Sequence, residues 1–430
     1  MSGTWRTQNK ELPGAYINIL GQTPISINLS ERGTVALPIE LGWGIKDKVY
    51  EVKQGDDTLK ILGAAIDEIV ELREALKGAS KVLICKVNEG TKATVELTSG
   101  VTATAVCEGT KGNDISVITK AVDSKHSITT YFNNSKVDEQ IVEAYGEFVN
   151  NGFIEITGSE AVAPGTKKLQ GGVDTRTSAT NYSSALKIFK TCNFNVLAYG
   201  GGDSETKSNI EAFIKEMREN EGIKVQGVMT NYSSDYEGII VVENGVILKD
   251  GSKLTPGQTV NWVAGVTAGA NINQSNTGKV YADAIDVSPR YTRTQMEEKT
   301  KAGKVMFKVD NNQRVTLVYD INSLVTFSPD KKKSFRKNRI IRTIDNIAND
   351  IAVVWEYNYM GKIDNNADGR SLYRGALIDY FNTLQKLNAI ENFTPEDITV
   401  GLGEESDAVI VNAAIQPVDS AEKLYMTINV

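Results

Sequence analysis

A single histidine, His126, limits the catalytic chemistry open to this 430-residue chain. A serine–histidine–aspartate triad, a cysteine–histidine pair or a multi-histidine metal site would have to include it. It lies in the stretch SKHSITTYF, and no nucleophile signature accompanies it. We therefore interpret His126 as part of a solvated strand or loop and predict no catalytic residue and no metal site.

Two polar segments match ligand-binding motifs only in part. Residues 364–369 (DNNADG) begin like an EF-hand calcium loop, but the twelfth position, which requires a bidentate carboxylate, is Gly375. Residues 199–204 (YGGGDS) have the place of a phosphate-binding loop between a strand and a helix. They lack the Gly-Lys-Ser/Thr and G-x-G-x-x-G signatures. We interpret both as plain turns and predict no cofactor.

Composition and charge exclude further classes. With 47 basic and 54 acidic residues the net charge is −7, which argues against bulk nucleic-acid binding. Three scattered cysteines, Cys85, Cys107 and Cys192, predict neither a disulfide framework nor a zinc site, so we expect reduced thiols and synthesis in the cytoplasm. The uncharged residues 254–278 include Pro256 and many polar side chains, which predicts a buried helix and a loop rather than a membrane span.

Alternating helix and strand patterns predict an α/β core with a mainly parallel sheet. Residues 57–79 carry leucine and isoleucine at helical spacing, and residues 81–87 form a short apolar run typical of a buried strand. The same alternation returns later, in helices over residues 178–190 and from Ser204 and in strands over residues 194–199 and 223–229.

The segment between these halves has a different character. Residues 91–163 are rich in Thr, Val, Ile and Gly with period-two stretches, which predicts a small β-sandwich or barrel inserted into the α/β domain. Farther on, Asn244-Gly245 between two apolar runs is typical of a type I′ hairpin. The last hundred residues predict a third unit, with one helix from Ser334 and a second over residues 373–387.

Apolar alternation near both ends predicts strands that dock on another sheet. Chain ends are normally polar and frayed unless something ties them down. After a strand predicted over residues 407–417 and a polar hinge, apolar side chains alternate again, and a shorter extended run follows Pro13-Gly14. We expect both segments to add strands to neighbouring subunits, as in a polymer-forming protein. The predicted arm residues are Tyr16, Ile17, Asn18, Ile19 and Leu20, and Leu424, Tyr425, Met426, Thr427, Ile428, Asn429 and Val430.

Six positive charges gather at the start of the helix predicted from Ser334. Cations at a helix N-terminus oppose its macrodipole, at a cost of about a few tenths of a kcal/mol each. We interpret the cluster as facing an acidic partner, and a merely solvated helix entry is the alternative. This basic cluster comprises Lys331, Lys332, Lys333, Arg336, Lys337 and Arg339.

Four blocks of the chain resemble contractile phage tail sheath proteins, in particular those of Gram-positive phages, defective prophages and phage-tail-like bacteriocins. The resemblance spans nearly the whole chain, and none of the blocks is a catalytic motif. They are PGAY from Pro13 with SERGTVA from Ser30, LQGGVD from Leu169, SFRKNRIIRTIDNIANDI from Ser334, and QPVDSAEKLYMTINV from Gln416.

The resemblance implies a multidomain α/β (α+β) fold. Its implied parts are an N-terminal arm (1–24), a subtilisin-like α/β core domain (25–90 and 164–330), an inserted β-sandwich (91–163), a C-terminal α+β domain (331–417) and a C-terminal arm strand (418–430). In such sheaths the arms extend the C-terminal-domain sheets of neighbouring subunits. The acceptor strands would then lie within residues 398–416.

The implied function is structural rather than enzymatic. Subunits would form stacked hexameric rings around a tail tube and contract to drive the tube through a target envelope. The implied partners are further copies of the chain, the tail tube protein, and baseplate and tail terminator proteins, with no nucleic acid and no membrane insertion. We expect a virion or phage-tail-like particle, assembled in the host cytoplasm and released by lysis, with the basic cluster against an acidic tube.

Two other interpretations stay open. A static, capsid-like structural protein would use the same strand exchange without any change in length. An α/β hydrolase or nucleotide-binding enzyme with accessory β domains would instead bind a small molecule saturably.

Overall fold

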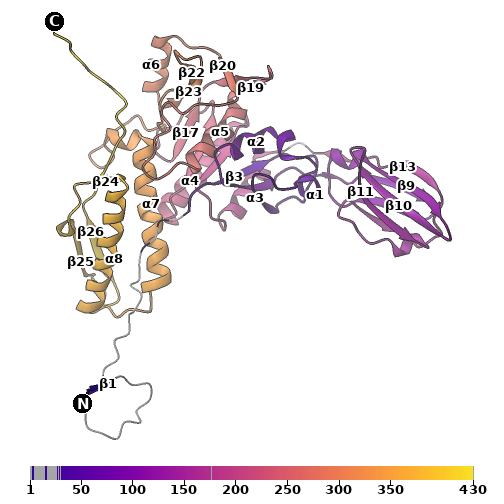
Figure 1. Ribbon diagram of the computed structural model, residues 1–430, viewed down its shortest axis with the longest axis horizontal. Helices are drawn as coiled ribbons and strands as arrows, with labels where there is room; N and C mark the ends of the chain where they lie inside the picture. The colour runs from indigo at the N-terminus through magenta and orange to yellow at the C-terminus, as the bar shows by residue number, and fades with distance from the viewer. Residues whose placement is uncertain are drawn as a thin grey trace. The chain divides into compact units, whose positions relative to one another are not determined.

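A computed structural model describes residues 31–429 except Arg176, together with Ile27, Leu29 and the backbone of Ser2, Gly3, Ala15 and Tyr16 (Figure 1). The chain divides into two compact units. One comprises Met1–Leu29 and Asp350–Gln416, and the other comprises Ser30–Asn349 and Pro417–Val430. We call them the hairpin unit and the core unit. The division falls within helix α7 (Asn338–Val354).

A seven-stranded sheet forms the centre of the core unit. All its neighbouring strands pair in parallel except β4 and β5, which are antiparallel. The mainly parallel α/β layer predicted from the sequence is therefore confirmed. In spatial order the strands are β21 (Lys304–Val305), β17 (Ile239–Val242), β16 (Gln226–Thr230), β15 (Val196–Tyr199), β3 (Thr34–Ile39), β5 (Lys81–Lys86) and β4 (Val49–Val52).

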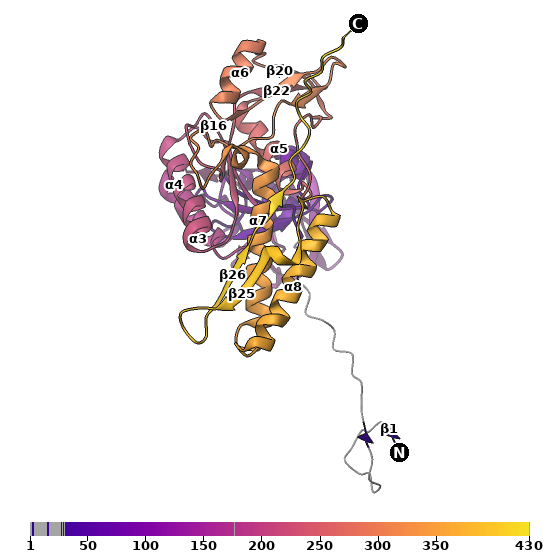
Figure 2. The same cartoon turned by 90° about the vertical axis from the view of Figure 1, so that its left-hand side faces the viewer.

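Helices cover both faces of this sheet. Side chains on successive strand residues point to opposite faces, so Val35 belongs to one hydrophobic core and Ala36 to the other. Helices α2 (Val70–Leu76) and α5 (Pro256–Ala268) contribute to the first core, and α3 (Ala179–Phe189) and α4 (Ser204–Lys215) contribute to the second (Figure 2). The buried helix predicted within residues 254–278 is α5.

The long helix predicted over residues 57–79 is wrong. The structure has three short pieces there, α1 (Leu59–Leu62), a 3-10 turn (Ile66–Glu68) and α2. Gly63 ends α1 in the left-handed region, with φ of 71°. A Cβ at Gly63 would lie 2.4 Å from Trp43 Cβ, so the backbone approaches the Trp43 side chain as only glycine permits.

The hairpin predicted at Asn244-Gly245 is also wrong. The strand before it, β17, belongs to the seven-stranded sheet, whereas the strand after it, β18 (Gly245–Leu248), pairs with β19 (Lys253–Leu254) and β20 (Ala284–Ser288). The Asn244 side chain is buried, donates to Phe307 O at 3.0 Å and accepts from Phe307 N at 2.8 Å. Asn244 therefore bridges backbone groups between sheets instead of forming a turn.

Two sheets occupy the β-rich segment of the core unit. They enclose a core that includes Ile115, Phe132 and Ile154. This arrangement agrees with the small β-sandwich predicted from the period-two stretches of the sequence. His126 lies within one of these strands, half-buried. The first sheet has the order β11 (Ser135–Val142), β10 (Lys125–Phe132), β9 (Ile115–Val122), β13 (Gly165–Lys168), and the second has β12 (Ile154–Thr157), β8 (Val101–Ala105), β7 (Thr94–Thr98).

The C-terminal part of the core unit contains short elements that lead into α7. Helix α6 (Arg293–Lys301) precedes the antiparallel pair β22 (Phe307–Val309) and β23 (Val315–Leu317). The basic cluster begins before a 3-10 turn over Lys333–Arg336, and α7 starts at Asn338 rather than at Ser334.

The hairpin unit contains α8 (Ala367–Lys386) and the strands β25 (Ile398–Leu402) and β26 (Val409–Ala413), which lie beside α8 in both views (Figures 1 and 2). Asn366 caps α8 by accepting a hydrogen bond from Gly369 N at 2.8 Å. The calcium-like DNNADG segment is thus a helix cap. No group of three or more potential metal-ligating side chains occurs in the described part of the chain.

Candidate assembly surfaces

The hairpin β25–β26 is a two-stranded sheet whose outer edges have no strand partner among the described residues. Ala414 N bonds to Asp397 O at 3.0 Å, and Gly403 N bonds to Ala408 O at 2.9 Å. Hydrogen-bonded pairs alternate with non-bonded pairs in an antiparallel ladder. The backbone N–H and C=O groups of Val409, Val411 and Ala413 therefore point to the open edge of β26. Such an edge is a template for another strand.

The apolar side chains of this hairpin are only half covered. Leu402 and Val411 share the face that carries the buried Ile398, yet Leu402 remains 55% exposed. On the other edge, Arg374 Nε donates to Ile398 O at 3.0 Å and so occupies part of the β25 edge. The edge of β26 is consequently the more accessible of the two.

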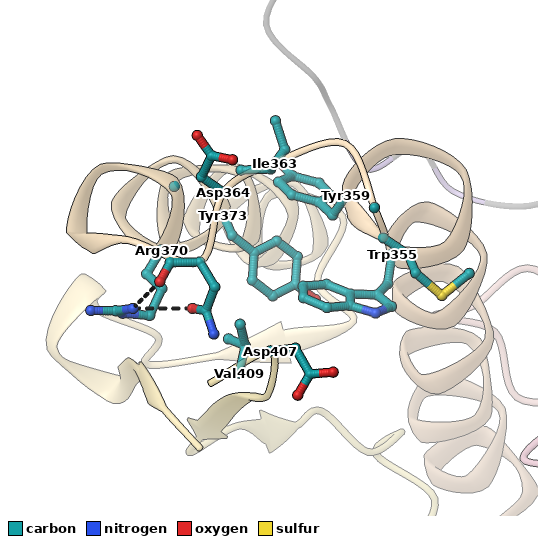
Figure 3. Close-up of a pocket in the computed structure, with 12 residues that line it drawn as sticks. Trp355, Tyr359, Ile363, Asp364, Arg370, Tyr373, Asp407 and Val409 are labelled. Carbon is teal, nitrogen blue, oxygen red and sulfur yellow. Dashed lines mark hydrogen bonds between the residues drawn. The ribbon is translucent and has the colours of Figure 1, made fainter. Parts of the chain in front are cut away.

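An aromatic pocket of about 440 Å³ adjoins the start of β26 (Figure 3). Trp355 and Tyr359 stack with ring centroids 6.0 Å apart, and Tyr373 meets Tyr359 edge-on at 4.6 Å. Val409 of β26 also lines the pocket, so its apolar wall is continuous with the open edge. The sequence analysis missed this pocket, although the aromatic run WEYNY at residues 355–359 was a visible signal.

The Tyr359 side chain is 3% exposed, and its hydroxyl has no hydrogen-bond partner in the part of the chain that the structure describes. Burial raises the pKa of Tyr359 and raises the pKa of Tyr373 to about 12, so both phenols stay protonated near neutral pH. A buried hydroxyl without a partner costs about 1–3 kcal/mol. The pocket thus offers one unused donor within an apolar wall.

Side-chain amides hold the hairpin loop to the start of α8. Asn365 Nδ2 donates to Ser406 O and to Ala408 O, each at 2.9 Å. Arg370 Nη1 in turn donates to Asn365 O and Oδ1, each at 3.0 Å (Figure 3). These bonds fix the loop that leads into β26, so the pocket and the open edge keep one geometry.

The predicted C-terminal strand is not formed within the single chain. Residues 418–429 have no regular secondary structure, and the Leu424, Met426 and Ile428 side chains are 69–84% exposed. Val430 lies outside the described residues. The apolar alternation found in the sequence therefore has no packing partner in this chain's described part.

The segment just before these residues is anchored in the core unit. Lys337, 7% exposed, forms an ion pair with Glu422 and a second with Asp419 at 3.5 Å. Ser275 Oγ donates to Glu422 Oε1 at 2.9 Å, and Arg339 Nη1 donates to Ser420 Oγ at 2.6 Å. Burial opposes the charge on Lys337, but its contacts with Glu422 outweigh burial and raise the pKa of Lys337. We call residues 419–423 the tail root.

The basic cluster is therefore divided. Lys337 and Arg339 bind the chain's own tail root, and Lys331 pairs with Glu237 at 2.7 Å. Lys332 and Lys333 are exposed, and burial lowers the pKa of the half-buried Arg336. Glu237 and the acidic side chains of the tail root thus pair with part of the cluster, and an external acidic partner stays a prediction for the rest.

The N-terminal arm lies mostly outside the described residues. The backbone of Ala15 and Tyr16 forms β2 (Ala15–Tyr16), which pairs in parallel with β1 (Ser2–Gly3). Ile17, Asn18, Ile19 and Leu20 lie outside the described residues, so their predicted role stays a prediction. Within the described residues, no helix is both long enough and apolar enough to cross a membrane.

Four family models match successive parts of the chain. They describe the N-terminal region of domain III of the tail sheath protein Gp18 (residues 32–87), the phage tail sheath β-sandwich domain (88–174), the phage tail sheath central domain (176–323) and the phage tail sheath C-terminal domain (330–430).

Similar proteins of known structure or sequence agree. The phage-like element PBSX protein XkdK of Bacillus subtilis is 37% identical, with 100% of this chain and 99% of that protein covered. The crystal structure of a sheath tail protein from Desulfitobacterium hafniense is also 37% identical, with a TM-score of 0.88 over 96% of this chain and 99% of that one. A contracted sheath of an extracellular contractile injection system shares the fold at 13% identity, with a TM-score of 0.62 over 98% of both chains.

The fold is thus a mixed α/β multidomain structure of the kind found in sheath subunits. The chain belongs to the phage tail sheath protein family, and it is a structural subunit of a tail sheath. The family resemblance stated from the sequence blocks is confirmed.

Proposed function

We propose that this protein polymerises as stacked hexameric rings around a tail tube and contracts to drive the tube through a target cell envelope. Two features of the same chain carry the proposal: the open strand edge of β26, and the exposed apolar segment at residues 424–429 that pairs with no strand among the described residues. Among the described residues, the β26 edge has no strand beside it, and residues 424–429 have no sheet to join. In the proposed sheath, residues 424–429 of one copy add to the β26 edge of another.

Strand exchange between subunits is the mechanism we propose for keeping the sheath joined. Val409, Val411 and Ala413 offer backbone donors and acceptors at the edge of β26, and an added strand gains about 1 kcal/mol net for each hydrogen bond. The C-terminal arm (residues 424–430) and the N-terminal arm (residues 16–20) would each add one strand to a neighbour. The connectors before the strands absorb rotation while the hydrogen bonds persist.

Contraction, in this proposal, is a repacking of rigid units between two arrangements of one chain. The core unit has a doubly covered parallel sheet, which is compatible with the subtilisin-like core that the family resemblance implies. A gain of even about 1–3 kcal/mol per subunit, summed over many copies, would supply the work without nucleotide. We propose no catalytic role, because the single histidine lies on strand β10 and its Nδ1 has no hydrogen-bond partner among the described residues.

The exposed part of the basic cluster is the surface we propose for the tube. Lys332 and Lys333 carry the charge available there, with Lys331 and Arg336 beside them. Charge reversal of Lys332 and Lys333 should weaken assembly on tubes while the subunit stays folded. Unaltered assembly on tubes would reject this contact. The other proposed partners are baseplate and tail terminator proteins.

We further propose that the sheath belongs to a virion or tail-like particle that is assembled in the bacterial cytoplasm and released by lysis. Negative-stain images of purified particles test the central claim. Hollow striated tubes in a long and a shorter, wider form support it, whereas tubes of one invariant length support a static structural protein.

Deleting residues 424–430 tests the strand exchange. We expect subunits or small oligomers that keep the circular dichroism spectrum of the full chain, because residues 424–429 are exposed and form no helix or strand. Normal tubes formed by the truncated chain would contradict the arm assignment.

A further inference from the structure

We infer that the aromatic pocket beside β26 is a specific receptor for the apolar face of residues 424–428 of a second copy of the chain. This inference rests on the proposed strand exchange and adds a side-chain site to it. Backbone pairing alone is indifferent to sequence, whereas the pocket would select the correct arm and hold it in one register.

The two surfaces match in period and number. On the open edge of β26, three residues with outward backbone groups, Val409, Val411 and Ala413, occur at every second position. In the arm, Leu424, Met426 and Ile428 occur at the same spacing. A strand added to this edge places residues opposite one another on the same face. The three apolar arm side chains would then lie on the face of β26 that borders the pocket.

The chemistry of the pocket suits these side chains. Trp355, Tyr359 and Tyr373 form the wall, and Val409 joins that wall to the strand edge. Aliphatic and thioether groups gain from burial against aromatic rings. The described arm residues 424–429 carry no charged side chain, so none would bring an unpaired charge into the site.

The buried Tyr359 hydroxyl supplies a second, independent indication. It is an unused donor on the aromatic wall of a pocket that Asp364, Asn365, Arg370 and Asp407 also line, and a carbonyl oxygen of an incoming strand is the acceptor that such a donor requires. In the single chain no described residue fulfils this role. We therefore assign the acceptor to the backbone of the bound arm.

The tail root keeps the arm available for a neighbour. Glu422 and Ser420 are bound by Lys337 and Arg339 of the same chain, so the freely exposed part begins at Leu424. A short free segment loses less conformational entropy on docking than a long one does.

A peptide-binding experiment tests the pocket. The acceptor is the full chain with its own arm disabled by Leu424→Ser, Met426→Ser and Ile428→Ser, and the probe is a dye-labelled peptide of residues 418–430. We expect saturable binding by fluorescence anisotropy and at least about tenfold weaker binding of a peptide with the same three serines, because each lost apolar side chain removes buried area.

The outcomes separate this inference from the proposed function. Equal affinity of the two peptides would reject the pocket as the receptor for the apolar side chains, but it would leave the proposed strand exchange intact. If neither peptide binds, the pocket is rejected as a receptor as well. The proposed strand exchange falls if the chain truncated before Leu424 also builds normal tubes, and the proposed contraction falls if all tubes have one invariant length.

Tyr359→Phe isolates the hydroxyl. The variant keeps the aromatic ring and loses a buried hydroxyl that has no partner in the single chain, so we expect a raised unfolding midpoint and about three- to tenfold weaker binding of the wild-type peptide. Unchanged affinity would overturn the assignment of the Tyr359 hydroxyl to the arm backbone.

Photo-cross-linking identifies the occupant in the assembled sheath. A photoreactive residue replaces Met360, an exposed residue that lines the pocket, in a mixture of two isotopically labelled populations. We expect mass spectrometry to find cross-links to residues 424–429 of the other population, and none from the same group at the control position Leu387. Cross-links to N-terminal residues, to the same copy, or to no arm at all would overturn the inference.

Discussion

The seven-stranded sheet and the β25–β26 hairpin are built from the same apolar strand residues but are completed differently. In the sheet, helices cover both faces, and Ile84 of β5 is fully buried. In the hairpin, Ile410 of β26 is 55% exposed, and a row of backbone groups faces outward. Chain stability therefore resides in the first region, and the second is the region that we propose to join other chains.

A chain with a rigid core and one open strand edge has the properties that the proposed strand exchange requires. The mainly parallel sheet offers only short edges to another strand, since its edge strands β4 and β21 are four and two residues long. A two-stranded hairpin is marginal by itself and gains most from an added strand.

The largest effect is expected from Ile84→Ala in the sealed sheet. Removing a fully buried isoleucine should lower the free energy of unfolding by about 2–5 kcal/mol, because a cavity remains in a packed core. Ile410→Ala in the hairpin, the matched control, should change it by less than about 0.5 kcal/mol. Urea unfolding of unassembled subunits measures the free energy of unfolding of both variants. Similar losses in the two would contradict the claim that the sheet contributes more to stability than the hairpin does.

A smaller loss is expected from Asn244→Ala. Its side chain satisfies the N–H and the C=O of Phe307, so its removal leaves buried backbone groups without partners and should cost about 1–3 kcal/mol. Asn312→Ala, in an exposed turn, is the control and should be neutral. A neutral Asn244→Ala would mean that the linkage between the two sheets does not depend on this bridge.

Lys337→Met should release the tail root at a cost of about 1 kcal/mol, because Glu422 can move into water when its partner is lost. Hydrogen exchange and limited proteolysis should accelerate within residues 417–423. Lys332→Met, an exposed member of the same cluster, should leave this segment protected. Equal protection in both variants would contradict the anchoring role.

The smallest effect on the subunit is expected from Leu402→Ser combined with Val411→Ser. Both residues are partly exposed, so unfolding should shift by less than about 1 kcal/mol, yet tube formation should fail because the apolar face offered to an arm is lost. Sedimentation and electron microscopy measure assembly, with Val149→Ser as an exposed control. Normal tubes from the double variant would show that strand addition does not use this face.

Local patterns predicted the elements wherever short-range periodicity decides structure. The strand at residues 81–87, the buried helix within residues 254–278 and the helix ending near residue 387 all follow from spacing alone. The strands at residues 398–402 and 409–413 lie within the range expected for the acceptor. Their acceptor role stays a prediction.

The local sequence patterns gave wrong predictions where contacts with distant residues determine the backbone conformation. Asn244-Gly245 has the composition of a tight turn, but the backbone of Phe307 holds Asn244 as a bridge between two sheets. The spacing over residues 57–79 suits one helix, but the indole of Trp43 and the left-handed Gly63 divide it. A local window contains neither partner.

Residue order and periods of two and 3.6 were enough to identify the family and the α/β alternation, whereas the arms that they predict stay a prediction. Only the tertiary structure decided that Lys337 binds the chain's own Glu422, and that Trp355, Tyr359, Tyr373 and Val409 surround one pocket. Apart from Trp355 and Tyr359, which are neighbours on one helical stretch, these contacts join residues far apart in the chain, and folding selects them through burial and charge pairing that no local pattern records.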